Sequence, residues 1–175
     1  RDGRCGLKQS YVMARMLYEK AVAQGDPDAM YSLAILYRDG RGVAQSFEKT
    51  AELYAMAAEL GHAKAMNNLG MLYRDGKGVV QSFEKAAELF TMAAEKGDVD
   101  AMLSLGTLYY QGQGVDRSNK LVRKWWTKAA NEGHEGAINN IEILDQQEAT
   151  TAATTTTPTT TTTSTRCCAA CNTPQ

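Results

Sequence analysis

Apolar residues recur at three- and four-residue steps along most of the chain, with polar residues between them. Within residues 63–74, Ala65, Met66, Leu69, Leu72 and Tyr73 recur at this spacing. This spacing places them on one face of an α-helix. A second stripe of the same kind lies within residues 82–96. A glycine-containing break separates the two stripes, so this part of the chain is predicted to form a helical hairpin.

The hairpin pattern repeats every 36 residues along the chain. The dipeptide Ala-Met returns at residues 29–30, 65–66 and 101–102, and a glycine returns at residues 25, 61, 97 and 133. A repeat at a fixed period of this length is typical of solenoid proteins. The pattern predicts first helices at residues 27–38, 63–74, 99–110 and 135–148. It predicts second helices at residues 10–24, 46–60, 82–96 and 118–132.

Capping residues mark the starts of these helices, and small residues mark where two helices come into close contact. Asp26 before Pro27 is a favoured N-cap and first helical residue, and Asp98 repeats the cap. A serine that follows each Gly-x-Gly-Val turn is suited to cap the second helix. The small residues Ala34, Gly70 and Gly106 fall at one position of the repeat, where a neighbouring helix can approach closely.

A single hairpin cannot bury both of its faces, so each unit must stack on the next. The sequence therefore predicts an all-α fold, an α/α superhelix (solenoid) of antiparallel helical hairpins in residues 1–148. Polar residues replace apolar ones in the last predicted helix, as a capping helix requires. The first 26 residues match only the second half of a unit, so we interpret the chain as a fragment of a longer protein.

The repeated string Ala-x-x-x-Leu-Gly-x-Leu-Tyr-x-x-Gly-x-Gly-Val, followed by Lys-Ala and Ala-Ala-x-x-Gly, resembles the Sel-one-like repeat (SLR) family. That family is related to the tetratricopeptide repeat, whose unit of about 34 residues is shorter. The resemblance covers residues 1–148 and includes a partial repeat, three full repeats and a capping helix. It implies the solenoid fold and a role in binding other proteins.

Composition and charge narrow the classes of partner. The formal net charge is −1, which gives no reason to expect nucleic acid as a partner of the repeats. No apolar run reaches even half the length of a membrane span, so no membrane partner is expected. The repeats carry no cysteine pairs, which favours a reducing compartment, the cytoplasm or the nucleus.

The C-terminal region differs from the repeats in composition. Residues 149–166 are rich in threonine and are predicted to form a disordered linker. Residues 167–175 follow it and contain Cys168-x-x-Cys171, the spacing of two thiolate ligands of a zinc ion. This end resembles the start of a truncated MYND zinc finger, while unpaired or incidental cysteines are the alternative. Four ligands are needed, so no cofactor is expected unless the chain continues beyond Gln175 with zinc ligands.

Other residue types that attract attention are assigned structural roles. The Gly-x-Gly turns lack the preceding strand and the following Lys-Ser/Thr of a phosphate-binding loop. His62 and His134 fall between hairpins, where Asp26 and Asp98 occupy the alternate units. For Trp125 and Trp126 we expect one side chain to pack in the core and the other to be partly exposed. No catalytic constellation remains, so the chain is not expected to be an enzyme.

The resemblance to tetratricopeptide-like stacks implies a binding groove on the concave face, lined by the first helices. Asparagine side chains there can bind the backbone of an extended peptide, and Arg38 and Arg74 can hold a carboxylate. The residues carried over to the groove by alignment are Tyr31, Ser32, Ile35, Arg38, Asn67, Asn68, Met71, Arg74, Leu103, Ser104, Thr107, Tyr110, Asn139 and Asn140.

The resulting hypothesis is a scaffold or adaptor that binds a protein or peptide in this groove. Two alternatives stay open at this point. Secreted, cysteine-rich relatives have been linked to hydrolase activity, although they carry a cysteine pair in each repeat. In the other alternative, the repeats are part of a larger zinc-finger regulatory protein, which sequence beyond Gln175 would reveal.

Overall fold

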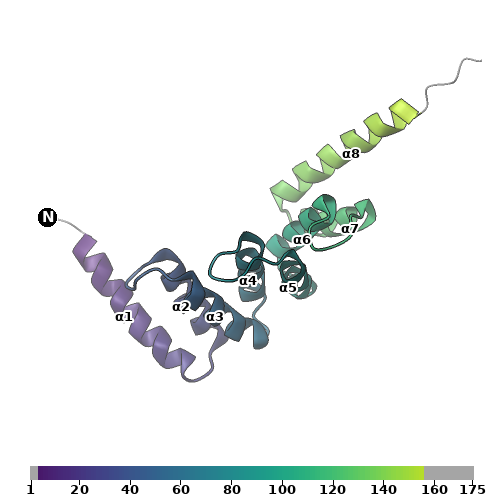
Figure 1. Cartoon of the computed structure of the whole chain (residues 1–175). Helices are drawn as coiled ribbons and strands as arrows, with labels where there is room; N and C mark the ends of the chain where they lie inside the picture. The colour runs from purple at the N-terminus through teal and green to yellow at the C-terminus, as the bar shows by residue number, and fades with distance from the viewer. Residues whose placement is uncertain (1–3, 156–175) are drawn as a thin grey trace, which may run out of the picture. The chain divides into compact units, whose positions relative to one another are not determined.

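The computed structural model describes the backbone of residues 4–155 and the side chains of residues 10–151, and in this part of the chain helices are joined by turns, without strands. Figure 1 shows the helices in chain order. They are α1 (Arg4–Val22), α2 (Pro27–Asp39), α3 (Phe47–Glu59), α4 (Ala63–Asp75), α5 (Phe83–Glu95), α6 (Val99–Gln111), α7 (Asn119–Asn131) and α8 (Glu135–Thr155). The chain divides into two compact parts, residues 1–142 and residues 143–175.

From α1 to α7, each helix packs against the next helix in the chain. The predicted all-α superhelix of stacked hairpins is therefore confirmed. The six helices from α2 to α7 begin and end within one residue of the predicted positions. Two helices are longer than predicted, because α1 begins at Arg4 and α8 continues to Thr155.

The helices begin at the predicted caps. The carboxylates of Asp26 and Asp98 accept hydrogen bonds from backbone N–H groups at the starts of α2 and α6. Ser46, Ser82 and Ser118 do the same for α3, α5 and α7. Each cap satisfies an N–H group that has no partner inside its own helix. The repeating sequence thus fixes the start of each of these helices.

His62 is the N-cap of α4, at the position where α2 and α6 have aspartate. Its Nδ1 accepts a hydrogen bond from the N–H of Ala65 at 3.0 Å. Its Nε2 lies 3.1 Å from Oδ1 of Asp28, in the first turn of α2. His134 repeats the second contact, with Nε2 3.3 Å from Oδ1 of Asp100. These contacts give both histidines a structural role at the junction between hairpins.

The core is built from a small residue in each first helix and a large one in the following second helix. Ala34 and Tyr54 lie in one buried cluster. In the next unit, a Cβ atom added to Gly70 would lie 2.8 Å from the ring of Phe90. In the third unit, the Trp126 ring fills the corresponding space. The prediction that these small positions permit close helix packing is confirmed.

Both tryptophans of α7 are buried, so the expectation that one of them is partly exposed was wrong. Trp126 packs over Gly106, and its Nε1 donates a hydrogen bond to the carbonyl oxygen of Leu103 at 3.2 Å. Trp125 is covered by the ammonium groups of Lys124 and Lys128, which lie 5.0 Å and 4.9 Å from the ring centroid. The flexible stems of long basic side chains can cover apolar surface in this way.

The second glycine of each Gly-x-Gly turn lies directly on the second helix of the preceding unit. Gly78 and Gly114 have φ angles of 71° and 68°. A Cβ atom on either glycine would lie 2.3 Å from a backbone carbonyl carbon, that of Phe47 or of Phe83. Glycine is therefore required at this position for two reasons: the backbone is left-handed, and the preceding helix is too close for a side chain.

The threonine-rich segment begins as helix. Residues 149–155, predicted to be part of a disordered linker, form the end of α8. The hydroxyl groups of Thr150 and Thr151 donate hydrogen bonds to the carbonyl oxygen of Gln147, at 2.9 Å and 2.7 Å. Such bonds within a helix satisfy the threonine hydroxyls locally. The rest of the predicted linker lies outside the described residues.

Candidate functional site

A cavity of about 640 Å³ lies between the end of α4, the turn that follows it, and α6. Four of the predicted groove residues line it: Arg74, Leu103, Ser104 and Thr107. The hydroxyl of Thr107 donates a hydrogen bond to the carbonyl oxygen of Leu103 at 2.9 Å. The other lining residues are Asp75, Lys77, Gln81, Phe83, Leu108, Gln111 and Gln113. We refer to this cavity as the α4–α6 cavity.

The charged residues of the α4–α6 cavity form one cluster. Nε of Arg74 donates to Oδ1 of Asp75 at 2.8 Å, and Nζ of Lys77 lies 3.4 Å from the other carboxylate oxygen. The hydrogen bond from Arg74 holds the pKa of Asp75 below its usual range. Two cations thus share one carboxylate, which leaves the cluster with a net positive charge. The cavity is suited to a ligand that carries a negative charge.

The same cluster occurs one repeat earlier, outside the α4–α6 cavity. Arg38 donates to Asp39 at 2.8 Å, and Nε of Arg41 lies 3.4 Å from the same carboxylate. The predicted carboxylate-binding arginines, Arg38 and Arg74, are therefore each already paired with the aspartate that follows. Each side chain is only half-buried, so the rest of the guanidinium group remains accessible.

A second group of predicted residues forms a packed network. The ring of Tyr31 stacks on the imidazole of His62, with centroids 4.7 Å apart. Nδ2 of Asn68 lies within hydrogen-bond distance of the hydroxyl oxygens of Tyr31 and Tyr54, at 3.4 Å and 3.2 Å. Burial raises the pKa of Tyr54. Asn68 thus joins two repeats through its amide group, instead of offering both donors to a peptide.

The prediction that Asn67 points into an open groove was wrong. Its side chain is only 5% exposed, and Oδ1 has no hydrogen-bond partner among the described residues. The reason is visible at equivalent positions. Tyr31 contacts His62 at the start of the next first helix, and Leu103 lies beside Gly136 in α8. This position of the repeat faces the following unit, so its side chain is covered.

Replacing Asn67 by leucine, the residue found one repeat later, is expected to raise the free energy of unfolding by about 1 kcal/mol. The substitution removes a buried acceptor without a partner, which costs roughly 1–3 kcal/mol. Urea denaturation monitored by circular dichroism measures the change. Asn68→Leu is the matched control and should destabilise the protein, because it breaks the contacts to both tyrosines. A less stable Asn67→Leu variant would show that the Oδ1 atom is satisfied.

The remaining predicted residues are distributed along the first helices. Tyr110 is half-buried and lies against Trp126, with ring centroids 5.7 Å apart. Asn139 is exposed and Asn140 is half-buried, both in α8. Half-buried side chains in α2 and α4 complete the set: Ser32, Ile35 and Met71. None of the residues in this paragraph lines the α4–α6 cavity.

Several cavity residues were not predicted, and all of them except Leu108 lie in or beside the turns. Nε2 of Gln81 donates to the carbonyl oxygen of Arg74 at 2.7 Å, and Gln45 makes the same contact with Arg38. Gln45 and Gln81 are 36 residues apart, and this recurrence in the sequence could have indicated that the turns contribute to the site. The prediction followed the first helices alone and therefore missed the contribution of the turns, including Lys77 and Gln113.

Metal sites and membrane spans are two further features on which the described residues bear. In residues 4–155, no helix has the length and apolar character needed to cross a membrane. The same part of the chain contains no group of three or more His, Cys, Asp or Glu residues placed to hold a metal ion. Cys168 and Cys171 lie outside the described residues, so the zinc-ligand prediction stays a prediction.

Known proteins with a similar structure are themselves built from helical repeats. The structure is similar to a protective antigen of uropathogenic Escherichia coli that displays an SLR fold, with 32% identity and a TM-score of 0.71 over 73% of this chain and 27% of the antigen. It is also similar to a Sel1 repeat protein from Oxalobacter formigenes, with 30% identity and a TM-score of 0.69 over 73% of this chain and 52% of that protein. Helicobacter pylori cysteine-rich protein B has 28% identity and a TM-score of 0.61 over 76% of this chain and 96% of its own.

A search of curated protein sequences gave no match. This chain spans well under two thirds of the first two structures, so their full-length activities do not transfer to it directly. The profile of the Sel1 repeat matches residues 1–26, 27–62, 63–98 and 99–134 in succession. Because these matches cover most of the sequence and agree with the stacked hairpins, the chain belongs to the Sel1 repeat family.

Proposed function

We propose that this protein is an interaction scaffold that binds an extended, acidic peptide segment of a partner protein in the α4–α6 cavity. Sel1 repeat proteins in general are non-catalytic scaffolds for protein–protein interaction. The observation that carries the finer proposal is the grouping of Arg74, Ser104 and Thr107 around one open cavity.

The lining supplies the hydrogen-bonding groups that a peptide backbone needs. Serine and threonine hydroxyls and glutamine amides can both donate and accept, so they match the alternating N–H and C=O groups of an extended chain. Phe83, Leu103 and Leu108 add apolar surface for a side chain of the peptide. Most of the lining residues are polar, and the three apolar ones leave room for one apolar side chain among them. Such a lining is more polar than that of most small-molecule sites and suits a peptide backbone.

The charge of the site favours an acidic residue in the peptide. The Arg74–Asp75–Lys77 cluster carries one more positive than negative charge. The guanidinium group of Arg74 has planar, forked donors, and Nε alone is committed to Asp75. Its terminal nitrogens can therefore bind a ligand carboxylate. Arg38 presents the same arrangement one unit earlier and extends the site along the stack.

Arg74→Ala is expected to weaken binding of an acidic peptide by about 1–3 kcal/mol, the value of a charge-assisted hydrogen bond. The probe is the tightest binder selected from a displayed library of random peptides against the purified chain. Its affinity is measured by fluorescence anisotropy. Arg38→Ala should also weaken binding of this peptide. Arg38 lies at the equivalent position of the preceding first helix, where an extended peptide along the stack would reach it.

The control for this experiment is Lys120→Gln, which removes an exposed cation that does not line the cavity. It should leave the affinity unchanged. Equal affinity for the parent, Arg38→Ala and Arg74→Ala proteins would refute the proposed site. Selected peptides without Asp or Glu would refute the proposed charge preference.

A further inference from the structure

Helix α1 can be compared residue by residue with the second helices of the later units. Gly42 lies against the backbone of Tyr11, as Gly78 does against Phe47 and Gly114 against Phe83. This contact fixes the register, so Tyr11, Phe47 and Phe83 are structurally equivalent. The residues that follow them along α1, α3 and α5 are therefore equivalent as well.

The outward face of α1 is apolar where those of α3 and α5 are charged. In α3 the outward positions are Glu48, Lys49 and Glu52, and in α5 they are Glu84, Lys85 and Glu88. All six side chains are exposed. The equivalent residues of α1 are Val12, Met13 and Met16, with exposed fractions of 38%, 58% and 46%. We refer to these three residues as the α1 patch.

A neighbouring repeat does not cover these positions. Helix α3 packs between α2 and α4, and α5 packs between α4 and α6, yet both leave the same positions exposed. Leu17 differs, because its counterparts Leu53 and Leu89 are apolar and half-buried within the stack. Lys49 and Lys85, the counterparts of Met13, lie over Tyr37 and Tyr73 of the preceding first helices, yet both stay exposed. Stacking of a further unit would therefore leave most of the α1 patch accessible to a different partner.

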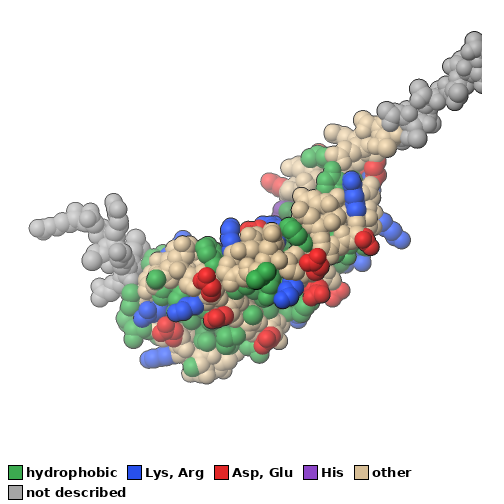
Figure 2. Space-filling model, viewed as in Figure 1, with side chains coloured by type: hydrophobic (Ala, Val, Ile, Leu, Met, Phe, Trp, Pro, Cys, Tyr) green, Lys and Arg blue, Asp and Glu red, His purple; other side chains and the backbone are tan. Residues whose placement is uncertain are grey.

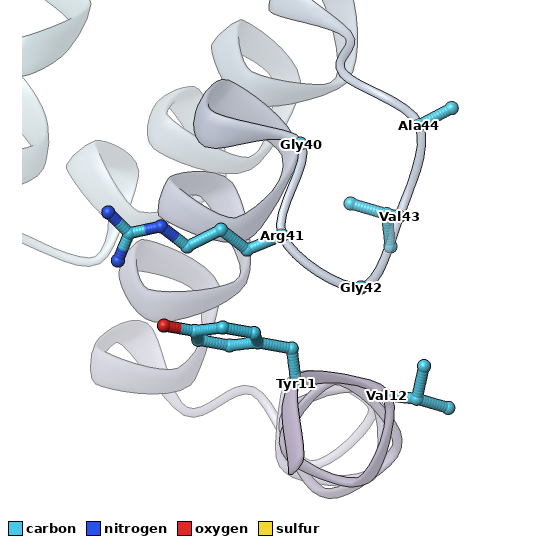
Figure 3. Close-up of a pocket in the computed structure, with 7 residues that line it drawn as sticks. All are labelled: Tyr11, Val12, Gly40, Arg41, Gly42, Val43 and Ala44. Carbon is cyan, nitrogen blue, oxygen red and sulfur yellow. The ribbon is translucent and has the colours of Figure 1, made fainter. Parts of the chain in front are cut away.

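A cavity of about 620 Å³ adjoins the α1 patch (Figure 3). It is lined by Tyr11, Val12 and the turn at residues 40–44. Val43 and Ala44 provide further apolar surface in that turn. Figure 3 shows the side chain of Arg41 extending over the ring of Tyr11, and its guanidinium carbon lies 5.8 Å from the ring centroid.

Charge distinguishes this cavity from the corresponding one on α5. Among the described residues, Arg41 is the charged one that lines the cavity beside α1. Its side chain is 54% exposed, although its Nε lies 3.4 Å from the carboxylate of Asp39. The cavity of about 490 Å³ beside α5 is lined instead by Glu84 and Glu88. The sequence of α1 carries four basic residues and one glutamate, a net charge of +3. The sequences of α3 and α5 each carry three glutamates and one lysine, a net charge of −2.

We infer that the α1 patch and its adjoining cavity form a docking surface for an acidic amphipathic helix of a partner protein. The apolar face of that helix covers Val12, Met13 and Met16, and one of its large side chains enters the cavity. A carboxylate beside this side chain pairs with Arg41. Methionine side chains are flexible and suit a surface that adapts to a helix. The surface is separate from the α4–α6 cavity.

Near the position of α1 in Figure 1, Figure 2 shows hydrophobic side chains at the surface, with basic and acidic side chains around them. The exposed apolar side chains of the α1 patch and the cation of Arg41 are complementary to the apolar and acidic faces of such a helix. Apolar contacts supply most of the affinity in such a complex, while the charges set orientation and partner choice.

The test uses a variant that gives α1 the outward residues of α3. Val12→Glu, Met13→Lys and Met16→Glu are combined in the full 175-residue chain. The three new side chains are native at the equivalent positions of α3, so helical content and Tm should stay close to those of the parent. The probe is the tightest binder from a displayed library of helix-forming peptides of about 18 residues, long enough for an isolated helix.

The parent protein is expected to select peptides with apolar residues at helical spacing and with adjacent Asp or Glu. For the triple variant, the Kd of the selected peptide should rise by a factor of about ten or more. Arg41→Gln should weaken binding several-fold and reduce its dependence on salt. Arg74→Ala in the α4–α6 cavity serves as the control and should leave this peptide's affinity unchanged.

Three outcomes would overturn the inference. The first is equal affinity of the parent and the triple variant, or failure of the parent to select any helical peptide. The second is the selection of peptides that contain no Asp or Glu. The third is self-association of the parent in sedimentation equilibrium that the triple variant abolishes, which would identify a second copy of this chain as the occupant.

Discussion

Gly78→Ala is expected to lower the free energy of unfolding by about 3 kcal/mol, a large fraction of the stability of a small domain. The φ angle of Gly78 is 71°, a conformation that costs an L-residue roughly 1–2 kcal/mol. The new Cβ atom would also lie 2.3 Å from the carbonyl carbon of Phe47. Overpacking of this kind adds roughly 1–3 kcal/mol, and here the obstacle is backbone, which cannot rotate away.

Gly97→Ala provides the matched control for this prediction. Gly97 also has a positive φ angle, of 91°, but an added Cβ atom would meet nothing within 4 Å. The substitution should cost only the backbone strain, roughly 1–2 kcal/mol. Denaturant unfolding of the two variants measures the difference between them. Equal losses would mean that the turn does not press on the preceding unit as described.

Gly106→Ala is expected to destabilise the protein by about 3 kcal/mol, although alanine is the better helix former by roughly 1 kcal/mol. The added Cβ atom would lie 2.3 Å from Cδ1 of Trp126. The indole ring must then move, and its hydrogen bond to the carbonyl oxygen of Leu103 is lost or strained. Overpacking and the loss of this bond outweigh the gain in helix propensity.

A second substitution tests the cause of this effect. Trp126→Tyr together with Gly106→Ala recreates the Ala34 and Tyr54 pair of the first full unit. The double variant should be more stable than Gly106→Ala alone, because the smaller ring leaves room for the methyl group. A double-mutant cycle from urea denaturation gives the coupling energy. Additive losses would show that the two residues do not compete for the same space.

The fold followed from the sequence because each unit repeats its signals. Asp26, Ser46 and the glycine turns mark the same boundaries in each unit, so an error in one unit is corrected by the others. The 36-residue period also aligned Ala34, Gly70 and Gly106, and this identified the close helix contacts. The helix boundary that departed most from prediction is the end of α8, which continues into a threonine run that no earlier unit contains.

The candidate site was harder to predict, because its geometry depends on contacts between units. Asn67 occupies a position that faces the next first helix, which the period alone does not reveal. The pairing of Arg74 with Asp75 was also missed, since adjacent residues do not face each other along a regular helix. They meet here because Asp75 is the last residue of α4, just before Gly76 turns the chain.

The seating of Gly42, Gly78 and Gly114 on main-chain atoms has a consequence for how this architecture can diversify. Because the spacing of successive units depends on backbone against backbone, the side chains on the outer rim take little part in holding the units together. Those outer residues are free to change independently from unit to unit. The basic, apolar rim of one unit and the acidic rims of its neighbours are variants that a common stack tolerates equally.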